Sequence, residues 1–113
     1  MTSEMIYETI HNTVLSLLPD ARILLFGSRA KGTADKHSDY DLMVITPNEL
    51  TKTERVTWTT QLNKAIVTAI NAPIDLLLYS EDEINRKQQL PGHIVRSAVR
   101  EGIPIWPKTL KSL

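Results

Sequence analysis

The sequence predicts a mixed α/β (α+β) fold, in which a small mixed β-sheet of three to four strands is covered by helices. Three observations predict this class. Apolar residues recur every three to four positions in four segments, as they do on the buried face of an amphipathic helix. Short apolar runs bounded by glycine or proline alternate with those segments, as buried strands do. The chain has 113 residues, so we expect residues 1–113 to form a single domain with one modest core.

The N-terminal part of the chain predicts one helix followed by a strand. Apolar residues three to four positions apart predict a helix over residues 3–18, capped by Ser3 and ended by Pro19. The apolar run that stops at Gly27 predicts a buried strand over residues 22–26.

The middle of the chain predicts a loop, a second strand and a long helix. Residues 27–37 contain two glycines and several small or charged residues, which indicate a turn, at most one helical turn, and a loop. The next run predicts a strand over residues 39–46, with its polar end first. Thr51 and Glu54 form a capping-box pattern, and the apolar face that follows continues the helix to residue 71.

The last third of the chain predicts a strand, two shorter helices and an edge strand. Residues 74–80 form an apolar run that predicts the third strand. Ser80 caps a helix over residues 81–89, with acids in its first turn and bases later, as the helix dipole favours. A further helix is predicted over residues 93–101, and an edge strand over residues 103–106.

The composition excludes several classes of protein. The chain has 13 basic and 13 acidic residues, so its net charge of zero argues against a large electrostatic attraction for nucleic acid. No apolar run approaches the about 20 residues of a membrane helix, and the N-terminus lacks the pattern of a secretory signal. The absence of cysteine excludes disulfides and thiolate nucleophiles. We therefore expect a cytoplasmic protein that binds neither a membrane nor nucleic acid directly.

Three aspartates lie at the starts of predicted strands. Asp39 and Asp41 stand two residues apart, so their side chains project to the same face of one strand, and Asp75 stands near the start of another. Two carboxylates so placed repel by about 2 kcal/mol at an effective dielectric constant near 20, and a cation between them relieves the repulsion. Magnesium binds one or two carboxylates and leaves positions for water and phosphate. The aspartates therefore predict metal-assisted phosphoryl chemistry.

A glycine-serine turn directly after the first strand complements the aspartates. Gly27 lets the backbone approach a phosphate, to which the following amides and the Ser28 hydroxyl can donate hydrogen bonds. Arg29 and Lys31 add positive charge, and Gly32 keeps the loop thin. Taken singly, each feature has a simpler explanation, because Gly-Ser is a common turn and Asp-x-Asp a common solvated strand start. Their combination at strand ends favours a phosphate and metal site.

The segment LFGSRAKGTADKHSDYDLMVI resembles the signature of the polymerase-beta-like nucleotidyltransferase superfamily, in which ten residues separate Gly-Ser from Asp-x-Asp. Here the two pairs are Gly27-Ser28 and Asp39-x-Asp41. The segment PIDLLLYS resembles the family's later strand with a third acidic residue, which falls on Asp75. A chain this short is similar to the minimal nucleotidyltransferases (MNT), including the antitoxins of HEPN–MNT toxin–antitoxin pairs.

The resemblance implies a reaction and a set of site residues. ATP would be the donor, AMP would pass to an acceptor hydroxyl, and pyrophosphate would leave. Asp39, Asp41 and Asp75 would be the catalytic residues and the ligands of two Mg²⁺ ions, with Asp75 as a ligand or as the general base. The nucleotide-binding residues would be Gly27, Ser28, Arg29 and Gly32.

Three functions remain open at this point. A chain of this size is expected to need a partner protein or a second copy to complete a nucleotide pocket. The leading hypothesis is an adenylyltransferase that modifies, and so neutralises, a HEPN-type ribonuclease toxin. The second is an antitoxin that masks its partner by binding alone. The third is an enzyme that modifies a small hydroxyl compound, such as an antibiotic, and works as a homodimer.

Overall fold

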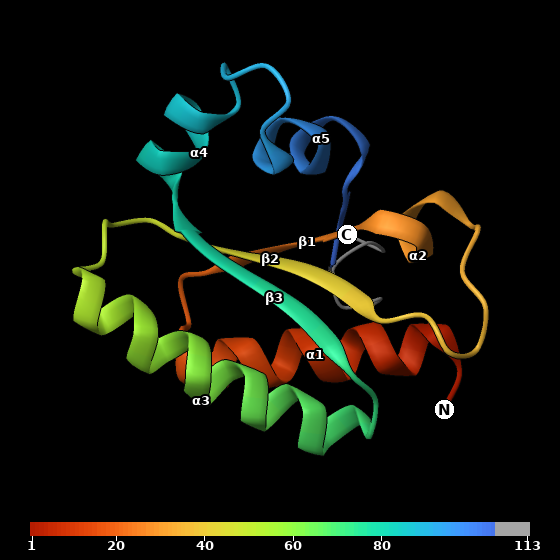
Figure 1. The fold of residues 1–113 in the computed structure, drawn as a ribbon. Coiled ribbons are helices and arrows are strands. Elements are labelled where there is room, and N and C mark those ends of the chain that lie inside the picture. Colours follow the sequence, from red (N-terminus) through yellow and green to blue (C-terminus); the bar gives the residue numbers. More distant parts are fainter. Residues whose placement is uncertain (106–113) are drawn as a thin grey trace, which may run out of the picture.

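The computed structural model describes residues 1–105 and contains a four-stranded sheet with helices on both faces (Figure 1). The strands are β1 (Arg22–Phe26), β2 (Tyr40–Thr46), β3 (Ile74–Ser80) and β4 (Ile103–Pro104). They lie in the order β3-β2-β1-β4. Strand β1 is antiparallel to both of its neighbours, whereas β2 and β3 are parallel. These observations confirm the predicted α/β class with a small mixed sheet.

The strands occur close to where the sequence predicts them. Strands β1 and β3 have the predicted bounds, and β2 begins at Tyr40, one residue later than predicted. Asp39 therefore lies just outside the sheet. The edge strand β4 pairs with β1, as Leu24 and Leu25 face its two residues. Trp106, the last residue of the predicted edge strand, lies outside the described residues.

The helices are α1 (Ser3–Leu17), α2 (Gly27–Lys31), α3 (Lys52–Ile70), α4 (Glu81–Lys87) and α5 (Ile94–Glu101). Helix α3 starts with the predicted capping box of Thr51 and Glu54. The predicted cap of α1 is wrong: Thr2, in an extended conformation, accepts the hydrogen bond from the Met5 amide, and Ser3 is the first helical residue. None of the helices within residues 1–105 is both long enough and apolar enough to cross a membrane.

The core consists of two apolar clusters, one on each face of the sheet. Helices α1 and α3 cover one face, and α4 and α5 cover the other (Figure 1). Strand β2 contributes to both clusters, and its residues 42–45 are each fully buried. The larger cluster, on the α1 and α3 side, includes Ile10, Val14, Leu42, Val44, Leu62 and Ile66. Because its second half is buried on both sides, β2 is a rigid base for the polar residues at its start.

Candidate active site

The three predicted aspartates lie at one end of the parallel strand pair. Asp41 and Asp75 are directly opposite each other in the β2–β3 register. Asp41 stands two residues before Met43, which lies in the cluster under α4 and α5, and Asp75 stands two residues before Leu77, which packs against it. Residues two apart on a strand share a face, so both carboxylates project to that face of the sheet. Asp39 precedes β2 and is exposed. The structure thus places Asp41 and Asp75 side by side at the edge of this face, with Asp39 at its rim.

Electrostatic coupling among the three aspartates shows in the titration of Asp41. Burial raises the pKa of the Asp41 carboxyl, and the negative charges of Asp75 and then Asp39 raise it further. No ion pair within residues 1–105 involves any of the three. The site therefore concentrates negative charge that no ion pair of the described residues neutralises.

Gly27 lies directly against Asp41. Phe26, the last residue of β1, pairs with Asp41 across the sheet, so the chain turns into α2 beside the carboxylate. A Cβ atom on Gly27 would lie 2.0 Å from Asp41 Oδ2, and its φ of 70° is in the left-handed region that disfavours other residues. Glycine is thus required here for two reasons, and the glycine-serine turn and the aspartates belong to one site.

The remaining predicted phosphate-binding residues lie on or next to α2, which flanks the start of β2 (Figure 1). Ser28 is half-buried, and its carbonyl accepts a hydrogen bond from the Thr33 amide. Gly32 ends α2 with a φ of 76°, in the left-handed region, and this backbone conformation favours glycine at the position. Lys31 pairs with Glu101 of α5 at 3.2 Å, with both side chains about half exposed.

Arg29 points to the loop between α2 and β2. It donates hydrogen bonds to the carbonyls of Ser38 and Asp35, and its guanidinium lies 3.9 Å from the centre of the Tyr40 ring. Tyr40 is buried and packs edge-on against Tyr7 of α1. Tyr40 belongs to the cluster on the α1 and α3 side, so it packs on the opposite face of β2 from Asp41.

The donor set fits magnesium in an open arrangement. Within residues 1–105, no three acidic or histidine side chains are placed to hold a metal ion between them. Magnesium does not need such a cage, because it takes one or two carboxylates and keeps water and substrate phosphate in its other positions. Asp41 and Asp75 supply two hard oxygen donors and an unneutralised charge. The ligand set of three aspartates stays a prediction.

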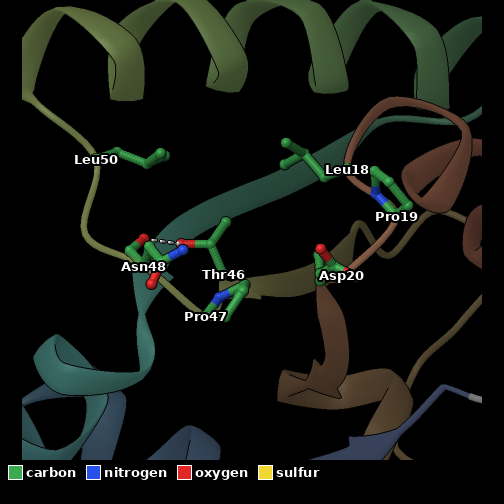
Figure 2. Close-up of a pocket in the computed structure, with 8 residues that line it drawn as sticks. Leu18, Pro19, Asp20, Thr46, Pro47, Asn48 and Leu50 are labelled. Carbon is green, nitrogen blue, oxygen red and sulfur yellow. Dashed lines mark hydrogen bonds between the residues drawn. The ribbon is translucent and has the colours of Figure 1, made fainter.

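A separate pocket lies at the opposite end of β2 and offers no comparable chemistry (Figure 2). Its volume of about 170 Å³ is below the roughly 300 Å³ at which pockets for small ligands begin. The Thr46 hydroxyl already donates to the Asn48 carbonyl at 2.9 Å, and Asp20 is the one ionisable residue of the lining. The lining residues are Leu18, Pro19, Asp20, Ala21, Thr46, Pro47, Asn48 and Leu50.

Three residues near the site escape sequence reasoning. Asp35 and Ser38 are not singled out by their spacing, yet their carbonyls receive the Arg29 hydrogen bonds. Tyr7 reads as part of the apolar face of a helix, and its contact with Tyr40 spans 33 residues of sequence. The sequence gives one indication of this contact. Tyr40 lies between Asp39 and Asp41, so its ring is expected on the face of β2 opposite to their side chains.

Comparisons with known proteins agree with this geometry. The family model described as "Polymerase beta, Nucleotidyltransferase" matches residues 11–108. A search of curated proteins gives no match.

Several solved structures have the same fold. A toxin–antitoxin structure with AMP-PNP aligns with 22% identity and a TM-score of 0.64, covering 97% of this chain and 77% of the other. A Sulfolobus solfataricus protein described as a nucleotidyltransferase aligns with 20% identity and a TM-score of 0.60, covering 94% and 81%. A complex of a tri-AMPylated Shewanella oneidensis HEPN toxin with its MNT antitoxin aligns with 19% identity and a TM-score of 0.58, covering 98% and 77%. At these identities, the likeness establishes the fold.

Proposed function

The chain belongs to the polymerase beta nucleotidyltransferase family, and from this premise we propose that it transfers AMP from ATP to a hydroxyl group of a partner protein. The proposed partner is a HEPN-type ribonuclease toxin, which the modification would neutralise. The proposed setting is the cytoplasm, where ATP and magnesium are both present.

The pair of Asp41 and Asp75 beside the Gly27 turn is the observation that carries this proposal. These carboxylates share one face and form no ion pair within residues 1–105, and the charge of Asp75 adds to burial in raising the pKa of Asp41. Structural ion pairs do not leave charge unneutralised in this way, whereas a site for a cation and a polyphosphate does. The proposal assigns Asp39, Asp41 and Asp75 to two Mg²⁺ ions.

Each residue of the site has a part in the proposed reaction. Bound magnesium would neutralise the phosphates and acidify the acceptor hydroxyl. The Ser28 hydroxyl and the backbone near Gly27 would donate hydrogen bonds to the outer phosphates. The acceptor oxygen would form a bond to the α-phosphorus as the bond to pyrophosphate breaks. Asp75, exposed beside Asp41, would act either as a metal ligand or as the general base that accepts the proton of the hydroxyl.

The choice of a protein acceptor rests on two supports. Among the structural neighbours, one is a toxin–antitoxin with AMP-PNP and another pairs an MNT antitoxin with an AMPylated HEPN toxin. The aspartates of this chain lie at the edge of the sheet, where Asp39 and Asp75 are exposed and accessible to a large acceptor. Both supports favour a folded protein over a small compound.

The test is to incubate the purified chain with magnesium, ATP and the product of the neighbouring gene, and to measure intact masses. We expect the second protein to gain the mass of one or more AMP residues, and the gain to disappear with Asp41→Asn. A stable complex without added mass would favour an antitoxin that acts by binding. Transfer to a panel of aminoglycosides, with none to protein, would favour a small-molecule enzyme.

A further inference from the structure

The loop before β2 enters the sheet at Tyr40, whose amide donates to the Pro73 carbonyl at 3.3 Å and so holds the peptide bond after Asp39. Asp39 stands one residue before Tyr40, where β2 begins, and its side chain is exposed. The loop spans residues 32–39 and contains no helix or strand. The peptide bond before Asp39 lies in the loop, so it has to be fixed by a different contact.

Arg29 makes that contact on the N-terminal side of Asp39. Its Nε and Nη2 atoms donate to the Ser38 carbonyl oxygen at 3.2 and 2.8 Å, and Nη2 also lies 3.3 Å from the Asp35 carbonyl oxygen. The Ser38 carbonyl belongs to the peptide bond that joins Ser38 to Asp39. Two hydrogen bonds from one planar group thus orient the peptide immediately before the aspartate.

The same guanidinium also holds the residue that follows Asp39. It lies 3.9 Å from the centre of the Tyr40 ring, in the geometry of a cation–π contact. Tyr40 is only 6% exposed and its ring meets Tyr7 at a centroid distance of 6.3 Å, so it is fixed by the core. Arg29 therefore links both chain neighbours of Asp39 to helix α2.

Hydrogen bonds within the loop transmit this constraint. Asp35 Oδ1 accepts from the His37 amide at 2.8 Å and lies 3.3 Å from the Ser38 hydroxyl, which also accepts from the Asp35 amide at 3.0 Å. These bonds give residues 35–38 one compact shape. Arg29 donates hydrogen bonds to the carbonyls of Asp35 and Ser38, the first and last residues of this segment.

We infer that Arg29 is a positioning residue for Asp39, and not a ligand of the nucleotide phosphates as the family resemblance implies. This inference rests on the proposed function, in which Asp39 binds metal. Arg29 suits this role because a planar guanidinium can donate two hydrogen bonds to a carbonyl and stack on an aromatic ring at the same time. A lysine ammonium cannot do both. Its Nε and Nη2 atoms and one face of its guanidinium are used within the fold.

The test compares Arg29→Lys with Arg22→Lys, a matched arginine that donates two hydrogen bonds to Glu81 at the far end of the sheet. Three quantities are measured: amide hydrogen exchange of residues 33–39, the Kd of ATP, and kcat for transfer. For Arg29→Lys we expect faster exchange in the loop, a kcat about 100-fold lower, and a Kd within about twofold of the parent. Arg22→Lys should change none of the three.

A second variant, Tyr40→Leu, removes the ring under the guanidinium and keeps an apolar side chain in the core. We expect it to accelerate loop exchange as Arg29→Lys does, although it leaves the Arg29 charge in place. Unchanged loop exchange in both variants, together with a Kd of ATP raised tenfold or more in Arg29→Lys, would overturn the inference and make Arg29 a phosphate ligand. If the parent protein transfers no AMP, the proposed function fails, and the exchange and Kd measurements still decide the role of Arg29.

Discussion

Acidic side chains lie at both ends of the parallel strands β2 and β3. Those at one end form ion pairs with arginines, and those at the other end form no ion pair within residues 1–105. At the end where these strands finish, three glutamates each pair with an arginine, at distances from 2.5 to 2.8 Å. The pairs are Glu49–Arg86, Glu81–Arg22 and Glu83–Arg55. At the end where the strands start, Asp39, Asp41 and Asp75 form no ion pair within residues 1–105.

The titration of one carboxyl at each end shows the same contrast. Burial raises the pKa of Glu83, but hydrogen bonds from Arg55 and from the Ser80 backbone outweigh it, so the pKa is lowered. Burial also raises the pKa of Asp41, and there the charges of Asp75 and Asp39 add to the increase. We therefore expect ionised Glu83 to stabilise the fold and ionised Asp41 to destabilise it, which is consistent with the proposal that the aspartates bind a cation.

The largest expected effect comes from removing one charge at the unpaired end. Asp41→Asn keeps the size of the side chain but removes a carboxylate from the proposed metal site. We expect AMP transfer to fall by about a thousandfold, because electrostatic groups at a reacting centre contribute effects of this order. The free energy of unfolding should not decrease. Intact-mass kinetics and urea denaturation on the same preparation measure the two quantities.

A loss of transfer that accompanies a loss of stability would contradict this division, because it would make Asp41 a structural residue. Asp20, which lies in the separate pocket at the other end of β2, offers a matched control. Asp20→Asn should change neither transfer nor stability appreciably.

The sequence predicts the two aspartate strands well but not the contacts that support them. The period of apolar residues and the local capping signals define β1, β3 and the start of α3, because those signals act between residues close in the chain. The places of Asp41 and Asp75 at strand starts are predictable, whereas their meeting also requires β2 and β3 to be parallel neighbours. The sheet order, and the grip of Arg29 on Ser38, depend on which segments pack together, and no local pattern encodes that.

The second-largest effect is a loss of stability, expected at the end of the sheet where the glutamates pair with arginines. Glu83 is 7% exposed, pairs with Arg55 and completes the Ser80 capping box at the start of α4. Glu83→Gln removes the charge, so we expect a loss of about 2 kcal/mol in the free energy of unfolding. Transfer of AMP, measured well below the melting temperature, should stay the same. Urea denaturation gives the first quantity and intact-mass kinetics the second.

The control for this prediction is Glu49→Gln, which breaks an exposed pair with Arg86 at the same end of the sheet. Exposed ion pairs contribute less than about 1 kcal/mol, so its effect should be clearly smaller than that of Glu83→Gln. Equal losses from the two variants would show that burial and the capping box add nothing, and the contrast between the two ends would then rest on charge pairing alone.

The smallest effect is the pH dependence of the free energy of unfolding. We expect it to have opposite signs for Asp41 and for Glu83, which lie at opposite ends of β2 and β3. Because the folded pKa of Asp41 is raised, its ionised form destabilises the fold at neutral pH, and this penalty disappears as the pH falls below the ordinary carboxyl value near 4. Asp41→Asn should therefore raise the free energy of unfolding at pH 7 by less than about 1 kcal/mol, since solvent screens a half-buried group. The gain should vanish near pH 4.

The pH profile of Glu83→Gln should have the opposite sign. The folded pKa of Glu83 is lowered, so its contribution is present above the ordinary carboxyl value and is lost as the pH falls through the lowered value. Urea denaturation of both variants from pH 7 to well below the ordinary carboxyl value compares the two ends directly. A gain for Glu83→Gln or a loss for Asp41→Asn at pH 7 would reverse the assignment of stabilising and destabilising acids. Opposite signs would establish that ionised Asp41 lowers the stability of the metal-free protein, whereas ionised Glu83 raises it.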